Sequence, residues 1–216
     1  TRSPDEIIAA QADAVTRELD VERDGSAQHT IQRISQAYPT TVEDLWEACT
    51  LPERLARWFS PVTGELRLGG RYQVEGNASG EVVACDPPRS FAVTWELGGG
   101  TSNLTVHVTA DTGGARLLIE HEHTGDADSP FWVQFGPGAT GVGWDLALLG
   151  LAFHMLAGQD RPDDPDAFAR TAAAKQFIRA ASDRWGDASV RAGTPTDDAR
   201  AAVGRTTAFY LGANEA

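Results

Sequence analysis

Residues 144–156 read WDLALLGLAFHML, and this stretch decides the fold. Apart from Asp145 and His154, its side chains are apolar or small on every side of a helix, and it ends at Ala157-Gly158. The apolar run is shorter than the roughly 18 residues that a membrane-spanning helix needs. A helix that is apolar around most of its circumference must then be covered by other parts of the protein. We therefore predict a long buried helix here, with a sheet that curls around it.

The preceding residues, 64–125, alternate between apolar and polar with a period of two, which is typical of strands. The apolar positions fall in successive runs: Tyr72 and Val74, then Val82 and Ala84, then Phe91, Val93, Trp95 and Leu97, then Leu104, Val106 and Val108, then Leu117 and Ile119. Short breaks rich in glycine, proline and aspartate separate these runs, and they leave no room for helical crossovers. The sequence thus predicts an antiparallel meander with one apolar face.

Capping residues mark helices before the meander. Ser3-Pro4-Asp5-Glu6 has the order of a capping box, and Thr41 and Pro52 are suited to open two more helices. The predicted elements are, in order, a helix from Ser3 to about Leu19, a charged connection over 20–27, a strand from His29 to Tyr38, and short helices ending at Cys49 and near Trp58.

Beyond the long helix, an acidic link with two prolines leads to two further amphipathic helices. We expect the first over Asp166 to Trp185 and the second from Thr196 to Gly212. Their apolar stripes should dock on the main domain, and the alternative is a contact that forms a homodimer. The predicted organisation is an N-terminal helix and connection over 1–27, a main domain over 28–158 and a C-terminal helical extension over 159–216.

Several words of the sequence resemble one protein family in combination. They are TVEDLWEACTLPERLARWF at 41–59, LGGRY at 68–72, DPP at 86–88, TWE at 94–96 and LIEH at 118–121. These words, and the order strand, two short helices, meander, long helix, resemble the START-like (SRPBCC) superfamily, and within it the group related to the activator of heat-shock-protein-90 ATPase. The resemblance covers about Gln28 to Ala157.

This resemblance implies an α+β helix-grip fold, in which a curved antiparallel sheet of six or seven strands surrounds a long C-terminal helix. It also implies a cavity between sheet and helix, which in different members holds lipids, sterols, polyketides or hormones. We therefore expect a binding protein for a small hydrophobic molecule rather than an enzyme. The alternatives are a cavity enzyme of the cyclase, aromatase or hydrolase type and a chaperone-interacting protein.

The candidate ligand-binding residues are those expected to face this cavity from the sheet, the long helix and the segment between them. They are Tyr72, Val74, Trp95, Val106, Leu117, Ile119, His121, Trp132, Phe135, Trp144 and Leu148. The glycine-rich segment 124–143, with its aromatic residues, is interpreted as a flap that could gate the pocket. A pocket of this kind is mostly apolar with a few polar groups that orient the ligand, and His121 is the candidate for that role.

Two local patterns suggest other chemistry but lack the necessary context. His121 and His123 point to the same side of a strand, as two metal ligands would, but nothing in the sequence places His154 or Asp145 beside them as a third. Gly136-Pro-Gly-Ala-Thr-Gly141 matches the dinucleotide fingerprint without a parallel strand before it or a second strand after it. We therefore expect no metal and no cofactor, and no catalytic residues are assigned.

Charge and cysteine content limit the partners. The net charge of −13 repels nucleic acids and anionic lipid surfaces, so we expect neither nucleic acid nor membrane as a partner. Cys49 and Cys85 are the only cysteines, and they are expected to be buried thiols in a reducing compartment. Without a cationic and apolar leader at its start, the sequence is expected to belong to a cytoplasmic protein.

Overall fold

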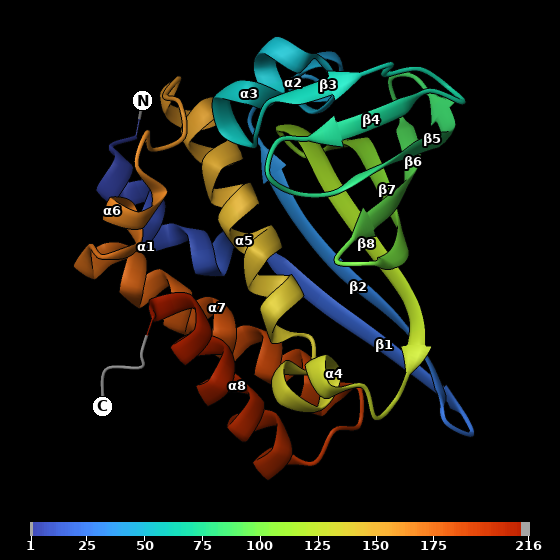
Figure 1. Ribbon diagram of the computed structural model, residues 1–216. Helices are drawn as coiled ribbons and strands as arrows, with labels where there is room; N and C mark the ends of the chain where they lie inside the picture. The colour runs from blue at the N-terminus through green and yellow to red at the C-terminus, as the bar shows by residue number, and fades with distance from the viewer. Residues whose placement is uncertain (1, 213–216) are drawn as a thin grey trace.

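Eight antiparallel strands form one sheet that curves around the central helix α5 (Gly138–Ala152), as Figure 1 shows. The computed structural model describes residues 2–212, except for the side chain of Asp166. The strands are β1 (Thr16–Asp24), β2 (Ala27–Tyr38), β3 (Val62–Gly64), β4 (Arg71–Val74), β5 (Ser79–Asp86), β6 (Ser90–Leu97), β7 (Gly100–Asp111) and β8 (Gly114–Asp126). Their order in the sheet is β1-β2-β8-β7-β6-β5-β4-β3, so the predicted meander β4 to β8 is extended by the hairpin β1-β2 beside β8.

The strand β1 occupies the place where the sequence predicted the end of a helix and a charged connection. Helix α1 (Pro4–Ala14) begins with the predicted capping box, but the chain is already extended at Val15. From Thr16 onward it pairs with β2, and Gly25, with φ of 62°, forms the turn. The prediction of a helix to Leu19 was wrong because the inward position 17 carries a charge, which disguises the alternation of a strand. The sheet consequently has eight strands instead of six or seven.

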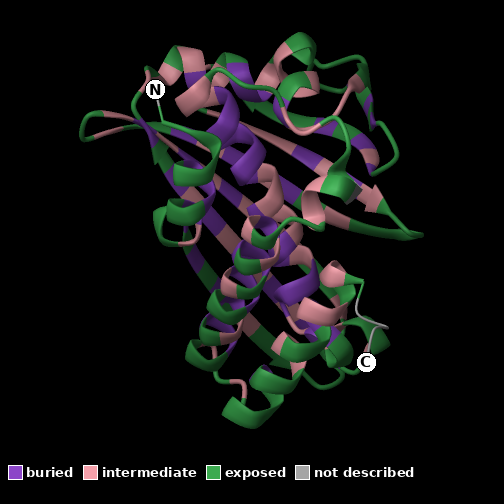
Figure 2. Ribbon diagram, turned by 90° about the vertical axis from the view of Figure 1, so that its left-hand side faces the viewer, coloured by how far each residue is buried: buried purple, intermediate pink, exposed green. Residues whose placement is uncertain are grey.

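The long buried helix is confirmed. Leu148, Leu149 and Leu151 on α5 are fully buried, and the helix continues as one π-helical turn, η1 (Phe153–Ala157). Figure 2 shows buried residues on this helix and on the strands that face it. Among the residues that the structure describes, only the segment Gly138–Ala157 is long and apolar enough to cross a membrane, and 67 % of its most apolar window is buried inside the protein. It is the central helix of the core, which the sheet and the other helices cover.

Helices flank α5 at both of its ends and on the side away from the sheet (Figure 1). They are α2 (Val42–Thr50), α3 (Pro52–Trp58), α4 (Pro130–Phe135), α6 (Pro165–Ala169), α7 (Ala172–Arg191) and α8 (Thr196–Leu211). The single helix predicted over 166–185 is in fact α6 and α7, since Thr171 interrupts it and caps α7 through the backbone N–H of Ala174. Helix α7 packs on α1, α5, β1 and α8, so its apolar stripe docks on the main domain.

A buried ion pair connects three of these elements. Arg17 on β1 donates from Nη2 to Oδ1 of Asp145 on α5 over 2.6 Å, and both residues are almost inaccessible to water. Trp185 on α7 donates its indole N–H to Oδ2 of the same carboxylate at 2.8 Å. The ring of Trp185 lies so close to Gly141 that a Cβ there would come within 2.3 Å of it. The carboxylate thus ties the C-terminal extension and the added strand to the central helix.

Candidate functional site

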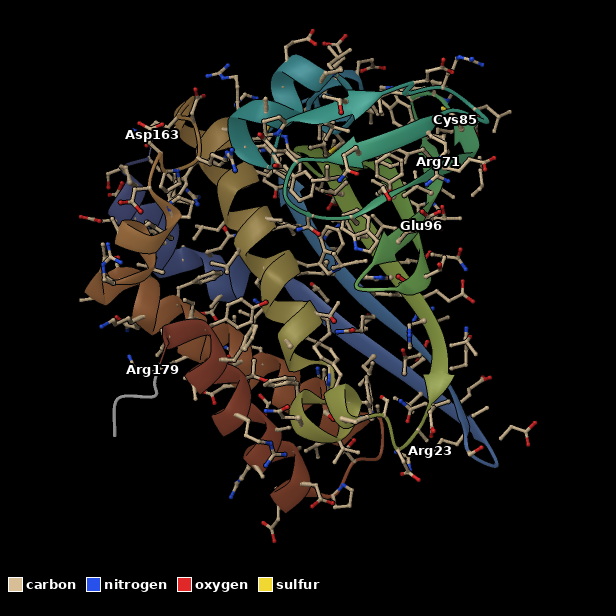
Figure 3. All side chains as sticks on the ribbon, in the orientation of Figure 1. Arg23, Arg71, Cys85, Glu96, Asp163 and Arg179 are labelled. Carbon is tan, nitrogen blue, oxygen red and sulfur yellow. The ribbon has the colours of Figure 1, made fainter. Side chains whose placement is uncertain are left out.

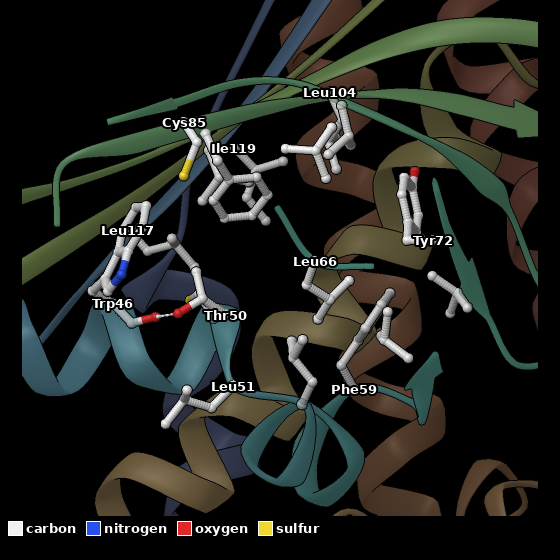
Figure 4. Close-up of a pocket in the computed structure, with 18 of the residues that line it drawn as sticks. Trp46, Thr50, Leu51, Phe59, Leu66, Tyr72, Cys85, Leu104, Leu117 and Ile119 are labelled. Atoms are coloured by element: carbon white, nitrogen blue, oxygen red, sulfur yellow. Dashed lines mark hydrogen bonds between the residues drawn. The ribbon is translucent and has the colours of Figure 1, made fainter. Parts of the chain in front are cut away.

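An apolar pocket of about 360 Å³ lies between the concave face of the sheet and the short helices α2 and α3 (Figure 4). The strands contribute Val62, Tyr72, Val74, Val82, Cys85, Phe91, Val93, Trp95, Leu104, Val106, Leu117 and Ile119. The helices and loops contribute Trp46, Cys49, Thr50, Leu51, Leu55, Trp58, Phe59, Leu66, Pro87 and Trp144. The long helix supplies only Trp144, so the wall opposite the sheet is α2 and α3 rather than the long helix that the sequence predicted.

Local sequence explains why α2 and α3 form this wall. The hydroxyl of Thr41 accepts the backbone N–H of Asp44 and starts α2, and Pro52 starts α3 directly after Leu51. Two short helices joined at one residue cannot separate, and the indole of Trp58 fastens them further by donating to the carbonyl of Ala48 at 2.8 Å. Their apolar faces therefore stay over the sheet and roof the pocket.

Aromatic side chains line two regions of the pocket. Phe59 stacks on Trp144 with ring centroids 6.4 Å apart, and Trp144 lies 5.3 Å from Trp95 in a tilted arrangement. Trp46 and Phe91 meet edge to face at 5.9 Å, close to the exposed Cys85. The exposed residues of the lining mark the opening of the pocket toward solvent; they are Leu51, Leu66, Cys85 and Pro87.

The polar groups of the lining are mostly satisfied within the protein. The hydroxyl of Tyr72 donates to the carbonyl of Thr94 at 2.6 Å, and that of Thr50 donates to the carbonyl of Trp46 at 2.8 Å (Figure 4). Burial raises the pKa of the Cys49 thiol to about 12 and that of the Tyr72 hydroxyl to about 12, so both stay protonated at neutral pH. Every lining residue is uncharged. The site can thus hold an apolar molecule but offers no ionised group to act on it.

Behind this wall, His121 holds the indole of Trp144. Trp144 Nε1 donates to His121 Nδ1 at 3.0 Å, and His121 Nε2 lies 2.7 Å from the hydroxyl of Ser102. Because Nδ1 accepts, the neutral ring carries its proton on Nε2 and donates it to Ser102. Burial, with a smaller contribution from His123, lowers the pKa of His121 from 6.5 to about 4. His121 is therefore neutral at pH 7 and positions a wall residue.

Acid should weaken the protein through this histidine. The unfolded chain binds a proton on the imidazole near pH 6.5, whereas the folded protein does so only near pH 4. The stability due to the neutral ring is thus complete above about pH 6.5, and we expect about 2 to 3 kcal/mol to be lost as the pH falls toward 4. Urea denaturation between pH 4 and 7 measures this loss. The variant His121→Gln, which keeps a donor and an acceptor but does not titrate, should lose less; equal losses would contradict the assignment.

Seven of the predicted ligand-binding residues lie in the pocket wall: Tyr72, Val74, Trp95, Val106, Leu117, Ile119 and Trp144. Four do not. His121 is behind Trp144, and Leu148 is fully buried where α5 packs. Trp132 and Phe135 belong to α4, which packs against α8, where Phe135 contacts Phe209 at 5.3 Å. Segment 124–143 is therefore the end of β8, then α4 and the start of α5, and since none of its residues lines the pocket it is not a flap over it.

The sequence-based prediction missed the lining residues Trp46 on α2, Leu55 on α3 and Phe59 directly after α3. It interpreted Trp46 and Trp58 as packing residues. It also overlooked Phe91, Val93 and Leu104, although they share the alternation of the strand residues that it did select. Cys85 was expected to be buried and is exposed at the pocket mouth. The signal that could have indicated these residues is the aromatic content of the two short helices, with Trp46, Trp58 and the adjoining Phe59. This is more aromatic surface than two such helices need to pack against each other.

The groups considered as metal ligands lie apart. His154 Nε2 accepts from Arg54 on α3 at 3.2 Å and Asp145 binds Arg17, while His123 is exposed on β8. Among the described residues, no three of the histidines, cysteines and carboxylates are placed to hold one ion. The glycine motif spans the end of α4 and the start of α5, where Gly136, with φ of 54°, ends α4. It joins two helices and has no strand before it.

The curved sheet, the central helix and the apolar pocket define a helix-grip protein of the START-like class. The sequence pattern of the family described as Activator of Hsp90 ATPase homolog 1-like protein (AHSA1) matches residues 39–152, more than half of the chain. This chain belongs to the AHSA1 family, as its sequence words indicated. The match contains α2, α3, the meander and α5 but excludes β1, β2 and the helices α6 to α8.

Solved structures share the fold beyond the family match. CalU16 from Micromonospora echinospora is 27 % identical in its crystal structure, with a TM-score of 0.59 over 79 % of this chain and 98 % of CalU16. The solution structure of CalU16 is 28 % identical, with a TM-score of 0.63 over 83 % of this chain and 97 % of CalU16. A conserved protein of unknown function from Enterococcus faecalis, EF2215, is 14 % identical with a TM-score of 0.56 over 87 % of this chain and 99 % of its own. No curated protein matches the sequence.

Proposed function

We propose that this protein binds a small apolar molecule in the pocket under α2 and α3 and holds it without converting it. The observation that carries the proposal is the pocket itself: about 360 Å³ enclosed by apolar and aromatic side chains, all of them uncharged. This volume lies in the range of natural small-molecule sites, which run from about 300 to 1,000 Å³. The pocket opens to solvent at Leu51, Leu66, Cys85 and Pro87, so a small molecule can enter it.

The composition of the lining favours binding over catalysis. A general acid or base must reach the reacting atoms, and among the described residues that line the pocket there is no histidine, carboxylate or lysine. The thiol of Cys49 is protonated, and a protonated thiol is a poor nucleophile. Both cysteines are free thiols, which supports our further proposal that the protein resides in the cytoplasm.

Nile red, a neutral dye that fluoresces in apolar surroundings, tests the proposal. Val106 lies on the pocket wall, and Val106→Trp should fill the space and weaken dye binding by about 30-fold or more. The neighbouring Thr105→Trp is the matched control, because position 105 alternates to the outer face of β7, and it should change the affinity less than about twofold. Fluorescence titration measures both, and circular dichroism confirms that both variants fold.

Cys85 provides an independent readout in the unmodified protein. Its thiol is exposed at the pocket mouth, and Figure 4 shows its sulfur directed toward the other lining side chains. Bound dye should slow its alkylation by iodoacetamide about tenfold, while Cys49, which is 7 % exposed, stays unmodified with or without dye. Dye binding that leaves Cys85 alkylation unchanged and is indifferent to Val106→Trp would locate the dye elsewhere and refute the proposal.

A further inference from the structure

We infer that the pocket selects an uncharged, flat aromatic molecule and rejects anionic amphiphiles such as fatty acids. This inference rests on the proposed function and adds the chemical class of the ligand. Three properties of the described residues carry it: the aromatic character of the walls, the pairing of every arginine in residues 39–97 with a carboxylate, and hydrogen-bonding groups in the lining that are all neutral.

Aromatic rings line two regions of the pocket. Phe59, from the end of α3, and Trp144, from α5, present a stacked pair beside Trp95 of β6. Trp46, from α2, meets Phe91 of β6 with its edge, and these two lie nearer the mouth at Cys85. A planar ring system gains face and edge contacts with such walls, about 0.5 to 1.5 kcal/mol for each pair beyond the area it buries. A saturated chain of equal apolar area gains none of these contacts.

Conformational entropy favours the same class of molecule. A fused ring system enters the pocket in one shape, whereas an alkyl chain loses rotamer freedom when it is enclosed. For a flexible protein side chain this loss costs about 0.5 kcal/mol or more, and an alkyl ligand pays a similar cost. The walls themselves are held in place, since the indoles of Trp58 and Trp144 are bonded to the carbonyl of Ala48 and to His121. A wall that is fixed in this way offers flat surfaces and does not mould itself around a chain.

The charges around the pocket exclude an anion. Residues 39–97, which form α2, α3 and β3 to β6, contain five arginines, no lysine and nine carboxylates. Each of the five arginines is already in an ion pair: Arg54 with Asp44, Arg57 with Asp160, Arg67 with Glu65, Arg71 with Glu96, and Arg89 with Asp86. Figure 3 shows Arg71 and Glu96 side by side on the surface. A carboxylate drawn into the pocket would therefore lose water without meeting an unpaired cation from residues 39–97, and the guanidinium of Arg161 beside them already donates to the carbonyl of Phe59 at 3.1 Å.

The hydrogen-bonding groups of the lining also suit a neutral guest. The hydroxyls of Thr50 and Tyr72 and the indoles of Trp58 and Trp144 already donate to protein acceptors. The hydroxyl oxygens of Thr50 and Tyr72 keep lone pairs that can accept, and the indole N–H groups of Trp46 and Trp95 have no hydrogen-bond acceptor among the described residues. A carbonyl or ether oxygen on the guest would satisfy such a donor.

One ring carrying three head groups tests the inference. We would titrate the full chain with 1-pyrenemethanol, 1-pyrenecarboxylate and 1-pyrenemethylammonium, and use 1-dodecanol as a saturated competitor, following quenching of tryptophan fluorescence. The alcohol should bind tightest. The carboxylate should bind about 100-fold more weakly because its charge is buried without a partner, and the ammonium about tenfold more weakly because indole faces partly compensate it. Dodecanol should displace 1-pyrenemethanol only at about tenfold higher concentration.

Variants separate aromatic selection from simple hydrophobicity. Trp95→Leu and Phe59→Leu keep the wall apolar and should weaken 1-pyrenemethanol about tenfold while changing 1-dodecanol less than about threefold. Trp132→Leu, on α4 outside the pocket, is the matched control and should alter neither. If the carboxylate or the ammonium binds as tightly as the alcohol, or dodecanol binds better, the inference is overturned while the binding function stands. If neither alcohol binds and Nile red also fails, the binding function itself is overturned.

Discussion

Asp145→Asn should lower the free energy of unfolding by about 3 to 5 kcal/mol, which is a large part of the stability of an ordinary domain. The substitution keeps the shape of the side chain but leaves the guanidinium of Arg17 buried without a counter-charge. Arg17 also donates to the carbonyls of Ala12 and Val15 at 3.0 Å, so its position is fixed and it cannot turn to solvent. Urea denaturation at pH 7 measures the loss.

Two comparisons show that the charge is responsible. Asp86→Asn removes the acid of an exposed pair with Arg89, whose side chains are 56 % and 72 % accessible, and should change the free energy of unfolding far less than Asp145→Asn does. The double variant Arg17→Met with Asp145→Leu removes both buried charges and should be more stable than Asp145→Asn, since an apolar pair leaves no ion unpaired. A small loss for Asp145→Asn alone would mean that water or another group solvates Arg17.

Trp185→Ala is the second substitution with a large expected effect, about 3 to 5 kcal/mol. The indole is 1 % exposed, it fills the space above Gly141 on α5, and its N–H donates to Asp145. Truncation leaves a cavity between α7 and α5 and removes a donor from a buried carboxylate. Trp185→Phe keeps most of the ring and loses the N–H, so it should cost about 1 to 3 kcal/mol.

Thermal and urea unfolding of both Trp185 variants test this ranking. Trp132→Phe serves as the matched control, because the indole of Trp132 on α4 is only partly buried, and it should be nearly neutral. Equal losses for Trp185→Ala and Trp185→Phe would show that the hydrogen bond to Asp145, and not the packing on Gly141, is what Trp185 contributes.

The sequence predicted the meander, the two short helices and the central helix because in these parts local pattern and final structure agree. Alternation in β4 to β8 and the caps at Thr41 and Pro52 are each readable without tertiary contacts. The strand β1 could not be read in the same way, since the inward side chain of Arg17 is charged, and its partner Asp145 lies 128 positions further along the chain. A buried ion pair between distant residues leaves no periodic signal.

The candidate site was predicted in part for a related reason. Alternation says which side of a strand is apolar, and it identified Tyr72, Trp95 and Ile119 correctly as residues of the inner face. It does not say how far along that face the helix extends. Where α5 packs on the inner face of the sheet, Leu148 and His121 are enclosed and leave no space. Further along the same face, α2 and α3 leave the pocket open. The location of empty volume depends on the packing of distant elements, which a single sequence does not display.

The fastening of α5 by Arg17, Asp145 and Trp185 has a consequence for motion. These contacts lie on the side of α5 that faces β1 and α7. Helix α3 instead reaches the far end of the helix, where Arg54 donates to His154 of η1. Buried contacts thus hold α5 and α7 together, whereas α2 and α3 border the mouth of the pocket, where Leu51 between them is exposed. Backbone amides of α5 and α7 should exchange with deuterium only on global opening, whereas those of α2 and α3 should exchange through local opening that an occupied pocket suppresses.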